Sequence, residues 1–168
     1  IILIIVGILI LATIFLLVKE ILGKIPEERT NVTIVEKIEE YNYYLEDRDN
    51  KIYKDEFKAL KTNLTDSEVN YEEYAKSIAK MFIIDFYTLK NKITKYDIGG
   101  LDFLLSGNVE NFKLKASDTI YKYIKDNSDG KRVQSLPTVS QIEVNNLSTS
   151  TFKINDDSYD AYIVELNW

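Results

Sequence analysis

Hydrophobic residues are concentrated at the start of the chain. Ile1–Val18 carries no charge, and only Gly7 and Thr13 interrupt its run of large apolar side chains. About 20 apolar residues in a helix cross the ~30 Å hydrocarbon core of a bilayer, and a lone segment in lipid must be helical to satisfy its backbone. The pattern predicts three parts: a transmembrane anchor over residues 1–22, a polar linker over residues 23–32 and a water-soluble domain over residues 33–168.

A cleaved signal peptide is the alternative interpretation of this run. The apolar core of such a peptide spans ~7–15 residues and ends in small residues that the peptidase recognises. Here the run is longer, and the sequence Lys19-Glu20-Ile21-Leu22-Gly23-Lys24 follows it. We therefore expect an anchor that is not removed. Because the chain begins within the apolar run and ends within a strand-like alternation, we also expect it to be a fragment of a longer protein.

Three later segments have apolar residues at helical spacing, and an asparagine that can cap a helix precedes each one. They are Lys51–Asn63 after Asn50, residues 71–89 after Asn70, and Val109 to about Asn127 after Asn108. Glu73 occupies the capping-box position of the second segment. Between Ala79 and Tyr87 its apolar residues cover nearly the whole circumference, which is typical of a helix buried on several sides. We expect this helix to form the core of the domain.

Alternation with a period of two predicts strands at both ends of the domain. Thr33–Glu46 fits either period, and its tyrosines favour a strand. After Pro137 the pattern predicts three strands, Ser140–Asn146, Thr151–Asn155 and Tyr159–Trp168, with a hairpin turn at residues 155–158. Helices followed by an antiparallel meander predict an α+β fold in which helices cover one face of a curved sheet. Because no turn follows Trp168, we expect this sheet to be incomplete at the C-terminus.

The composition excludes several classes of function. A net charge of -6 argues against nucleic acid as a partner and against a basic patch on an anionic leaflet. The chain has no cysteine and no histidine, so it lacks disulfides, thiolate nucleophiles and the commonest general base and metal ligand. We therefore expect no metal, no cofactor and no enzymatic activity.

Two motifs are better explained by local structure than by ligand binding. Asp47-Arg48-Asp49-Asn50-Lys51 begins like a calcium loop, but its fifth residue is a lysine and no glycine follows, so a turn and a helix cap are expected. Gly99-Gly100, with Gly107 nearby, lacks both the preceding strand and the Gly-Lys-Ser/Thr of a phosphate loop. These glycines are expected to serve the geometry of the loop.

Asp85 is the candidate site residue, because it lies inside the apolar sequence MFIIDFYTL. A carboxylate in such a place must be paired or hydrogen-bonded. One hypothesis makes it a catalytic or ligand-binding acid at the mouth of a cavity. The favoured hypothesis makes it a structural acid that holds the Gly99-Gly100 loop through backbone N–H groups or pairs with Lys92.

The order of anchor, linker, buried helix, glycine loop, helix and terminal meander resembles that of membrane-anchored domains of the nuclear-transport-factor-2-like superfamily. Such domains occur in assembly proteins of type IV secretion and Gram-positive conjugation systems. Residues 71–123, with FIIDFYTLKNK at Phe82–Lys92 and YDIGG at Tyr96–Gly100, also resemble small membrane proteins of AT-rich Gram-positive bacteria. The resemblance implies a cone-shaped fold and a place in the bacterial cell membrane, with the domain on the extracytoplasmic side, but no chemistry.

Three functions are compatible with these features. The first is a single-pass, non-catalytic interaction or assembly domain that binds protein partners or itself, and the resemblance implies a place for it within a secretion or conjugation machine. The second is a membrane-tethered sensor that holds a small ligand between sheet and helices. The third, and least favoured, is an enzyme that uses Asp85 with a tyrosine.

The anchor gives the first testable prediction. A helix over residues 1–22 should keep the chain in the pellet when membranes are washed with alkaline carbonate, because peripheral proteins are released by this treatment and spanning helices are not. Recovery of a shorter, soluble chain processed near Gly23 would instead identify a signal peptide.

Overall fold

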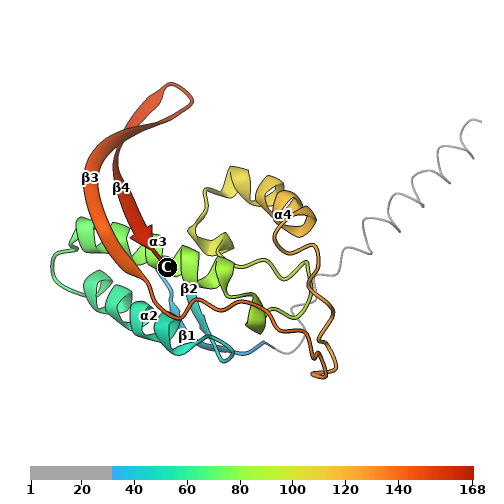
Figure 1. Cartoon of the computed structure of the whole chain (residues 1–168). Coiled ribbons are helices and arrows are strands. Elements are labelled where there is room, and N and C mark those ends of the chain that lie inside the picture. Colours follow the sequence, from blue (N-terminus) through green and yellow to red (C-terminus); the bar gives the residue numbers. More distant parts are fainter. Residues whose placement is uncertain (1–31) are drawn as a thin grey trace, which may run out of the picture. The chain divides into compact units, whose positions relative to one another are not determined.

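The computed structural model describes residues 32–168, and the predicted anchor lies outside the described residues (Figure 1). No helix within residues 32–168 is long and apolar enough to cross a membrane. This part of the chain has the expected α+β composition. Its helices are α2 (Lys51–Leu64), α3 (Tyr71–Tyr87) and α4 (Val109–Asp118), and its strands are β1 (Ile34–Ile38), β2 (Tyr43–Glu46), β3 (Glu143–Ile154) and β4 (Asp157–Asn167). Short 3₁₀ turns occupy Leu89–Asn91, Leu101–Phe103 and Ser106–Asn108.

The first strand-like segment is a hairpin rather than a single strand. β1 pairs with β2 in antiparallel fashion, and Ile38 lies opposite Tyr43. Asn42 has a φ of 56°, a left-handed conformation that asparagine adopts more readily than most residues. The alternation of residues continues through this turn, so the pattern alone gave no sign that the chain reverses there.

Both predicted caps of the long helices are confirmed. The side-chain oxygen of Asn50 accepts the N–H of Tyr53 at 2.9 Å, and that of Asn70 accepts the N–H groups of Glu72 and Glu73 at 3.1 Å each. Glu73 does not complete the capping box. The N–H of Asn70 donates instead to the side chain of Asn63, at 2.9 Å, which ties the end of α2 to the start of α3.

Helix α3 contributes to both hydrophobic cores, as its apolar circumference predicted. It lies between α2 and α4 (Figure 1). Met81 and Ile84 belong to the first core, and Phe86 belongs to the second. The first core is completed by residues of β1, β2, α2 and the segment before β3: Ile38, Leu45, Tyr53, Phe57, Leu60, Leu64 and Val139. The second is completed by Leu89, Ile98, Ala116, Tyr121 and Ile124.

Helix α4 is shorter than predicted. It ends at Asp118 rather than near Asn127, and Asn108 makes no side-chain capping bond. The N–H groups of Thr119 and Tyr121 both donate to the carbonyl of Ala116, so the chain leaves the helix in tight turns. These turns place both Tyr121 and Ile124 in the second core, where they are buried.

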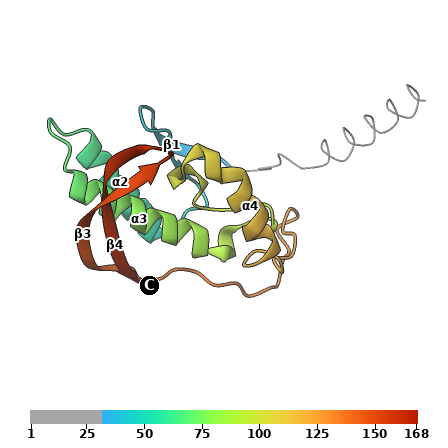
Figure 2. The same ribbon diagram turned by 90° about the horizontal axis from the view of Figure 1, so that it is seen from above.

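The C-terminal region has two long strands instead of the three predicted. Ser148–Ser150, expected to connect two strands, lies inside β3, and the register with β4 shifts only between Val144 and Asn146. The hairpin turn is where it was predicted, with Asn155 at a φ of 56°. This β3–β4 ribbon curves away from the helices (Figures 1 and 2), while at its base the ring of Trp168 lies 5.4 Å from that of Tyr87. Within residues 32–168, the β1–β2 and β3–β4 pairs are separate sheets.

Candidate functional site

Asp85 makes both of the contacts that its structural interpretation offered. One carboxylate oxygen forms an ion pair with the ammonium group of Lys92, and the other accepts the N–H of Gly100 at 2.6 Å. The side chain of Lys92 is only 2% exposed, and that of Asp85 is 21% exposed. The pair therefore joins α3 to the loop of residues 92–100 inside the domain.

The two glycines are required by how closely this loop approaches α3. A Cβ on Gly99 would overlap the backbone oxygen of Asp85 and lie 2.7 Å from the ammonium nitrogen of Lys92. Gly100 has a φ of 77°, and a Cβ there would lie 2.8 Å from the ring of Phe82. Any larger side chain would push the loop away from Asp85, so the glycines serve the geometry of the loop, as expected.

Tyr121 holds the same loop from its other side. Its hydroxyl donates to the carbonyl of Phe86 at 2.7 Å and accepts the N–H of Gly99 at 3.1 Å. The side chain is fully buried, and burial raises the pKa of its hydroxyl, which therefore stays protonated. Sequence reasoning did not single out Tyr121, because the irregular end of α4 takes it off the helical stripe.

A second polar cluster holds the middle of the loop against β2. Arg48 binds both carboxylate oxygens of Asp97, at 3.0 Å to Oδ1, and its Nε donates to Glu46 at 2.7 Å. The N–H of Ile93 also donates to Asp97, at 2.8 Å. Burial opposes ionisation of Asp97, but the hydrogen bonds and charge of Arg48 hold its pKa below the ordinary value. Asp97 is thus an anion at neutral pH, and both of its carboxylate oxygens accept hydrogen bonds from Arg48 or from the backbone of the loop.

The turn of residues 47–50 serves the fold, as its departure from a calcium loop indicated. Asp49 accepts the N–H of Glu46 at 2.7 Å, and Asn50 caps α2. Burial raises the pKa of Asp49 to about 6, while the hydrogen bond from Glu46 opposes this rise. Within residues 32–168, no group of three or more histidine, cysteine, aspartate or glutamate side chains is arranged to hold a metal ion.

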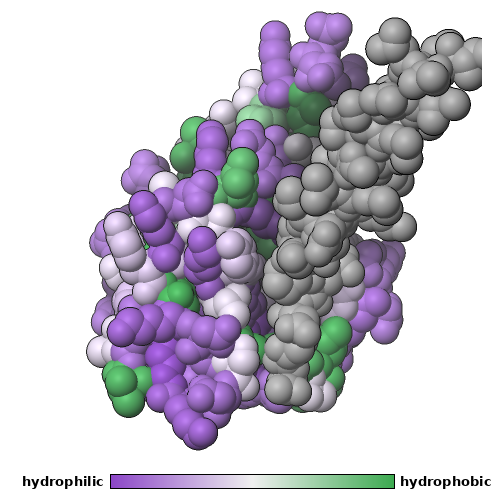
Figure 3. Space-filling model, turned by 90° about the vertical axis from the view of Figure 1, so that its right-hand side faces the viewer, coloured by the Kyte–Doolittle hydropathy of each residue, from purple (hydrophilic) through white to green (hydrophobic). Residues whose placement is uncertain are grey.

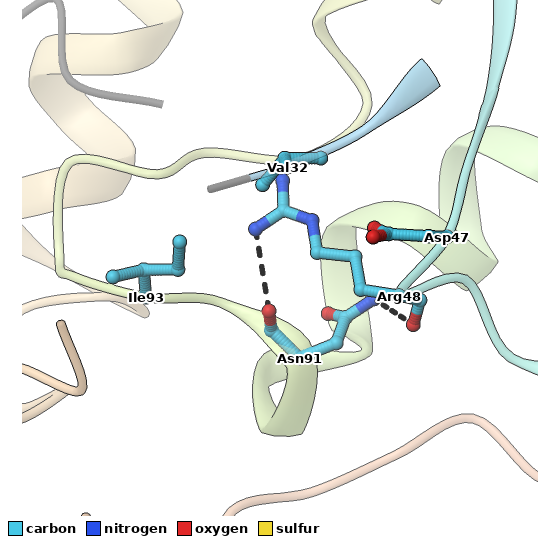
Figure 4. Close-up of a pocket in the computed structure, with 5 residues that line it drawn as sticks. All are labelled: Val32, Asp47, Arg48, Asn91 and Ile93. Atoms are coloured by element: carbon cyan, nitrogen blue, oxygen red, sulfur yellow. Dashed lines mark hydrogen bonds between the residues drawn. The ribbon is translucent and has the colours of Figure 1, made fainter. Parts of the chain in front are cut away.

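An open pocket of about 340 Å³ lies beside Arg48 (Figure 4). It is lined by Val32, Asp47, Arg48, Asn91 and Ile93. The Arg48 guanidinium donates to the carbonyl of Asn91 at 3.2 Å, and the Asn91 amide reaches back to the carbonyl of Arg48 at 3.5 Å. Among the described residues nothing donates to the buried Oδ1 of Asn91. This oxygen is buried and so is not open to a molecule in the pocket, and neither Asp85 nor the two glycines line the pocket.

The Asp85–Lys92 pair gives the second testable prediction. Asp85→Leu leaves the buried ammonium of Lys92 without its counter-ion, and it should cost about 3–5 kcal/mol of the free energy of unfolding. Asp85→Asn also removes the counter-ion, but its amide oxygen can still accept a hydrogen bond from Gly100 or Lys92, so it should cost less than Asp85→Leu, about 1–3 kcal/mol. Chemical denaturation of the two variants measures both values.

The matched control removes both charges. Asp85→Leu combined with Lys92→Met should be more stable than Asp85→Leu alone, because no unpaired charge then remains inside the domain. If Asp85→Leu by itself raised the melting temperature, Asp85 would be a strained functional acid and its structural assignment would be wrong.

Comparisons of this chain with models of protein families, with curated proteins and with solved structures found no match. Its function is therefore inferred from its own surfaces and polar groups. The polar groups around Asp85 are occupied by contacts within the domain, whereas the β3–β4 ribbon exposes large apolar side chains to solvent.

Proposed function

We propose that this chain is a single-pass, membrane-anchored, non-catalytic interaction domain, and that the β3–β4 ribbon is its docking element. The observation that carries the proposal is the exposure of large apolar side chains on a ribbon that leaves the body of the domain. Phe152, Tyr159 and Ile163 are 54%, 50% and 53% exposed. Apolar groups gathered on a projecting element are typical of surfaces that other proteins cover.

These side chains share one face of the ribbon. Residues opposite one another in an antiparallel pair point to the same side, and Phe152 lies opposite Tyr159 while Ser148 lies opposite Ile163. Successive even-numbered positions of β3 continue this face as far as Ile154. A partner that covers this face would bury four aromatic or aliphatic side chains at once: Phe152, Ile154, Tyr159 and Ile163.

The edge of β3 also suits the addition of a strand. From Val144 to Phe152 it has no charged residue, and within residues 32–168 it pairs only with β4. β4 carries Asp157, Asp160 and Glu165, and charges of this kind discourage pairing at a strand edge. The preferred partner is therefore a protein segment in extended conformation that pairs with β3 and places apolar residues on the Phe152 face. A second copy of this chain meets the same requirement.

The setting proposed for this interaction rests on the predicted anchor and on what the resemblance implies. An anchor over residues 1–22 holds the domain beside the bacterial cell membrane, on the extracytoplasmic side, where a secretion or conjugation machine is assembled from several membrane proteins. A strand added to the ribbon would enlarge it towards the curved sheet of a nuclear-transport-factor-2-like cone. The absence of histidine and cysteine, together with the structural contacts of Asp85, supports a role without catalysis.

A small-ligand sensor is the second candidate, and the pocket at Asn91 favours it. A small polar ligand would occupy its volume of about 340 Å³ beside Arg48 and Asn91. The pocket is open and its arginine is already bound to Asp97, so it offers few groups for tight or selective binding. The ribbon therefore remains the better-supported functional element.

The ribbon gives the third testable prediction. Phe152→Ser combined with Ile163→Ser should release the chain from its complex in mild detergent, lowering its sedimentation coefficient to that of a single chain in a micelle. Both side chains are already more than half exposed, so the free energy of unfolding should change by less than about 1 kcal/mol in total.

Val35→Ser is the matched control, because Val35 is equally exposed on the other sheet. It should leave the complex intact. A complex that survived the double substitution, or an unsubstituted chain that already sedimented alone, would contradict the docking role of the ribbon.

A further inference from the structure

One segment near the end of the helical region has more bases than acids, unlike the acidic chain as a whole. The segment of residues 109–133 holds Lys113, Lys115, Lys122, Lys125, Lys131 and Arg132, whereas β4 has three acids and no base. Of the acids in this segment, Glu110 pairs with Lys113, and Asp126 and Asp129 accept backbone N–H groups of their own turns. The fourth acid of this segment is Asp118. Charge is therefore unevenly distributed over the domain: residues 109–133 have more bases than acids, and β4 has only acids.

The same segment exposes large apolar side chains between its lysines. Leu114 is 63% exposed, Tyr123 is 76% exposed and Val133 is 99% exposed. Ile120 is exposed as well, and the ammonium nitrogen of Lys122 lies over the ring of Tyr123, 5.5 Å from its centroid. Figure 3 looks onto this side of the domain, where single hydrophobic residues stand among hydrophilic ones.

Hydrogen bonds bring the two ends of the segment together. The side chain of Gln134 donates to the carbonyl of Tyr123 and accepts the N–H of Lys125, both at 2.9 Å. Arg132 donates to the carbonyl of Lys125 at 3.1 Å. The neighbours of Val133 are therefore fixed against residues 123–125. We use the name basic face for the exposed lysines and apolar side chains of the segment: Leu114, Lys115, Ile120, Lys122, Tyr123, Lys125, Lys131 and Val133.

The basic face lies beside the point where the chain enters the domain. Val32, the first described residue, lines the same pocket as Ile93. The carbonyl of Ile93 accepts the N–H of Asn127 at 2.9 Å, and Arg132 donates to the carbonyls of Lys90 and Lys92, both at 2.8 Å. In Figures 1 and 2, residues 128–136 and the start of β1 lie on the side of the domain away from the β3–β4 ribbon.

We infer that the basic face contacts the surface of an anionic phospholipid bilayer. This inference rests on the proposed anchor, whose linker of residues 23–32 spans at most ~35 Å at ~3.5 Å per residue. Lysines interleaved with exposed aliphatic and aromatic side chains are the composition of interfacial surfaces, where the ammonium groups bind lipid phosphates and the apolar groups enter the headgroup region. The contact turns the acidic ribbon away from the membrane and presents it to a partner.

A fluorescent probe on the full-length chain tests this contact. The chain has no cysteine, so Val133→Cys gives a single attachment site for an environment-sensitive dye on the basic face, and Asp156→Cys gives the matched site at the tip of the ribbon. Each labelled chain is reconstituted into vesicles of phosphatidylcholine alone or mixed with phosphatidylglycerol, both containing a spin-labelled lipid. Co-flotation with the vesicles reports the anchor, and quenching of the dye reports the surface contact.

In the anionic vesicles we expect about twofold or more quenching at residue 133 compared with residue 156, and no such difference in phosphatidylcholine alone. Lys115→Glu, Lys122→Glu and Lys125→Glu together should reduce quenching at residue 133 to the level seen at residue 156. Chains that float but show equal quenching at both positions, or quenching that survives the three charge reversals, would overturn the contact alone. Chains that do not float would contradict the anchor and the contact with it.

Discussion

The ammonium group of Lys92 lies inside the domain, and the arrangement around it depends on the carboxylate of Asp85. Removing a charge from water costs several kcal/mol, so a buried lysine is tolerated only with a counter-ion in direct contact. Asp85 supplies this counter-ion from α3 and at the same time binds the backbone of Gly100. The loop of residues 92–100 can close on α3 only because Gly99 and Gly100 leave room for that approach.

Several other elements are positioned through this loop. Tyr121 joins its end to the exit of α4, and Arg48 joins its middle, through Asp97, to β2. The second hydrophobic core forms between these contacts, with Phe86 and Ile98 at its centre. The side chains of Asp85, Lys92 and Asp97 are thus engaged in contacts that hold the fold. The outer surfaces differ in character: the β3–β4 ribbon exposes apolar side chains and carries three acids on β4, whereas residues 109–133 expose lysines.

The sequence predicted those features that depend on neighbours along the chain. The caps at Asn50 and Asn70, the buried circumference of α3 and the hairpin turn at residues 155–158 all follow from local spacing. The end of α4 was wrong, because Tyr121 leaves the helix in order to reach Phe86 and Gly99, and no local signal marks that distant contact. The division of the C-terminal region into three strands was wrong as well, since Ser148–Ser150 is a strand by virtue of its pairing with β4.

The candidate site shows the same limit. Asp85 could be found because a carboxylate is conspicuous among isoleucines and phenylalanines, and Lys92 could be paired with it because only one loop separates them. Arg48 and Asp97 are far apart along the chain, and neither stands out from the other charged residues of its segment. Asn91 lines the pocket and has a buried side-chain oxygen without a donor among the described residues, but in the sequence it simply follows a lysine in a polar stretch. Such groups become visible only when tertiary contacts show which of them are satisfied.

The central claim, that the domain acts through two different outer surfaces, is tested most directly by photo-cross-linking in native membranes. Benzoylphenylalanine is placed in one variant at Phe152 on the ribbon and in another at Tyr123 on the basic face. The account predicts a discrete protein adduct from position 152 and a phospholipid adduct, identified by mass, from position 123. A protein adduct at position 123 together with none at position 152 would contradict it.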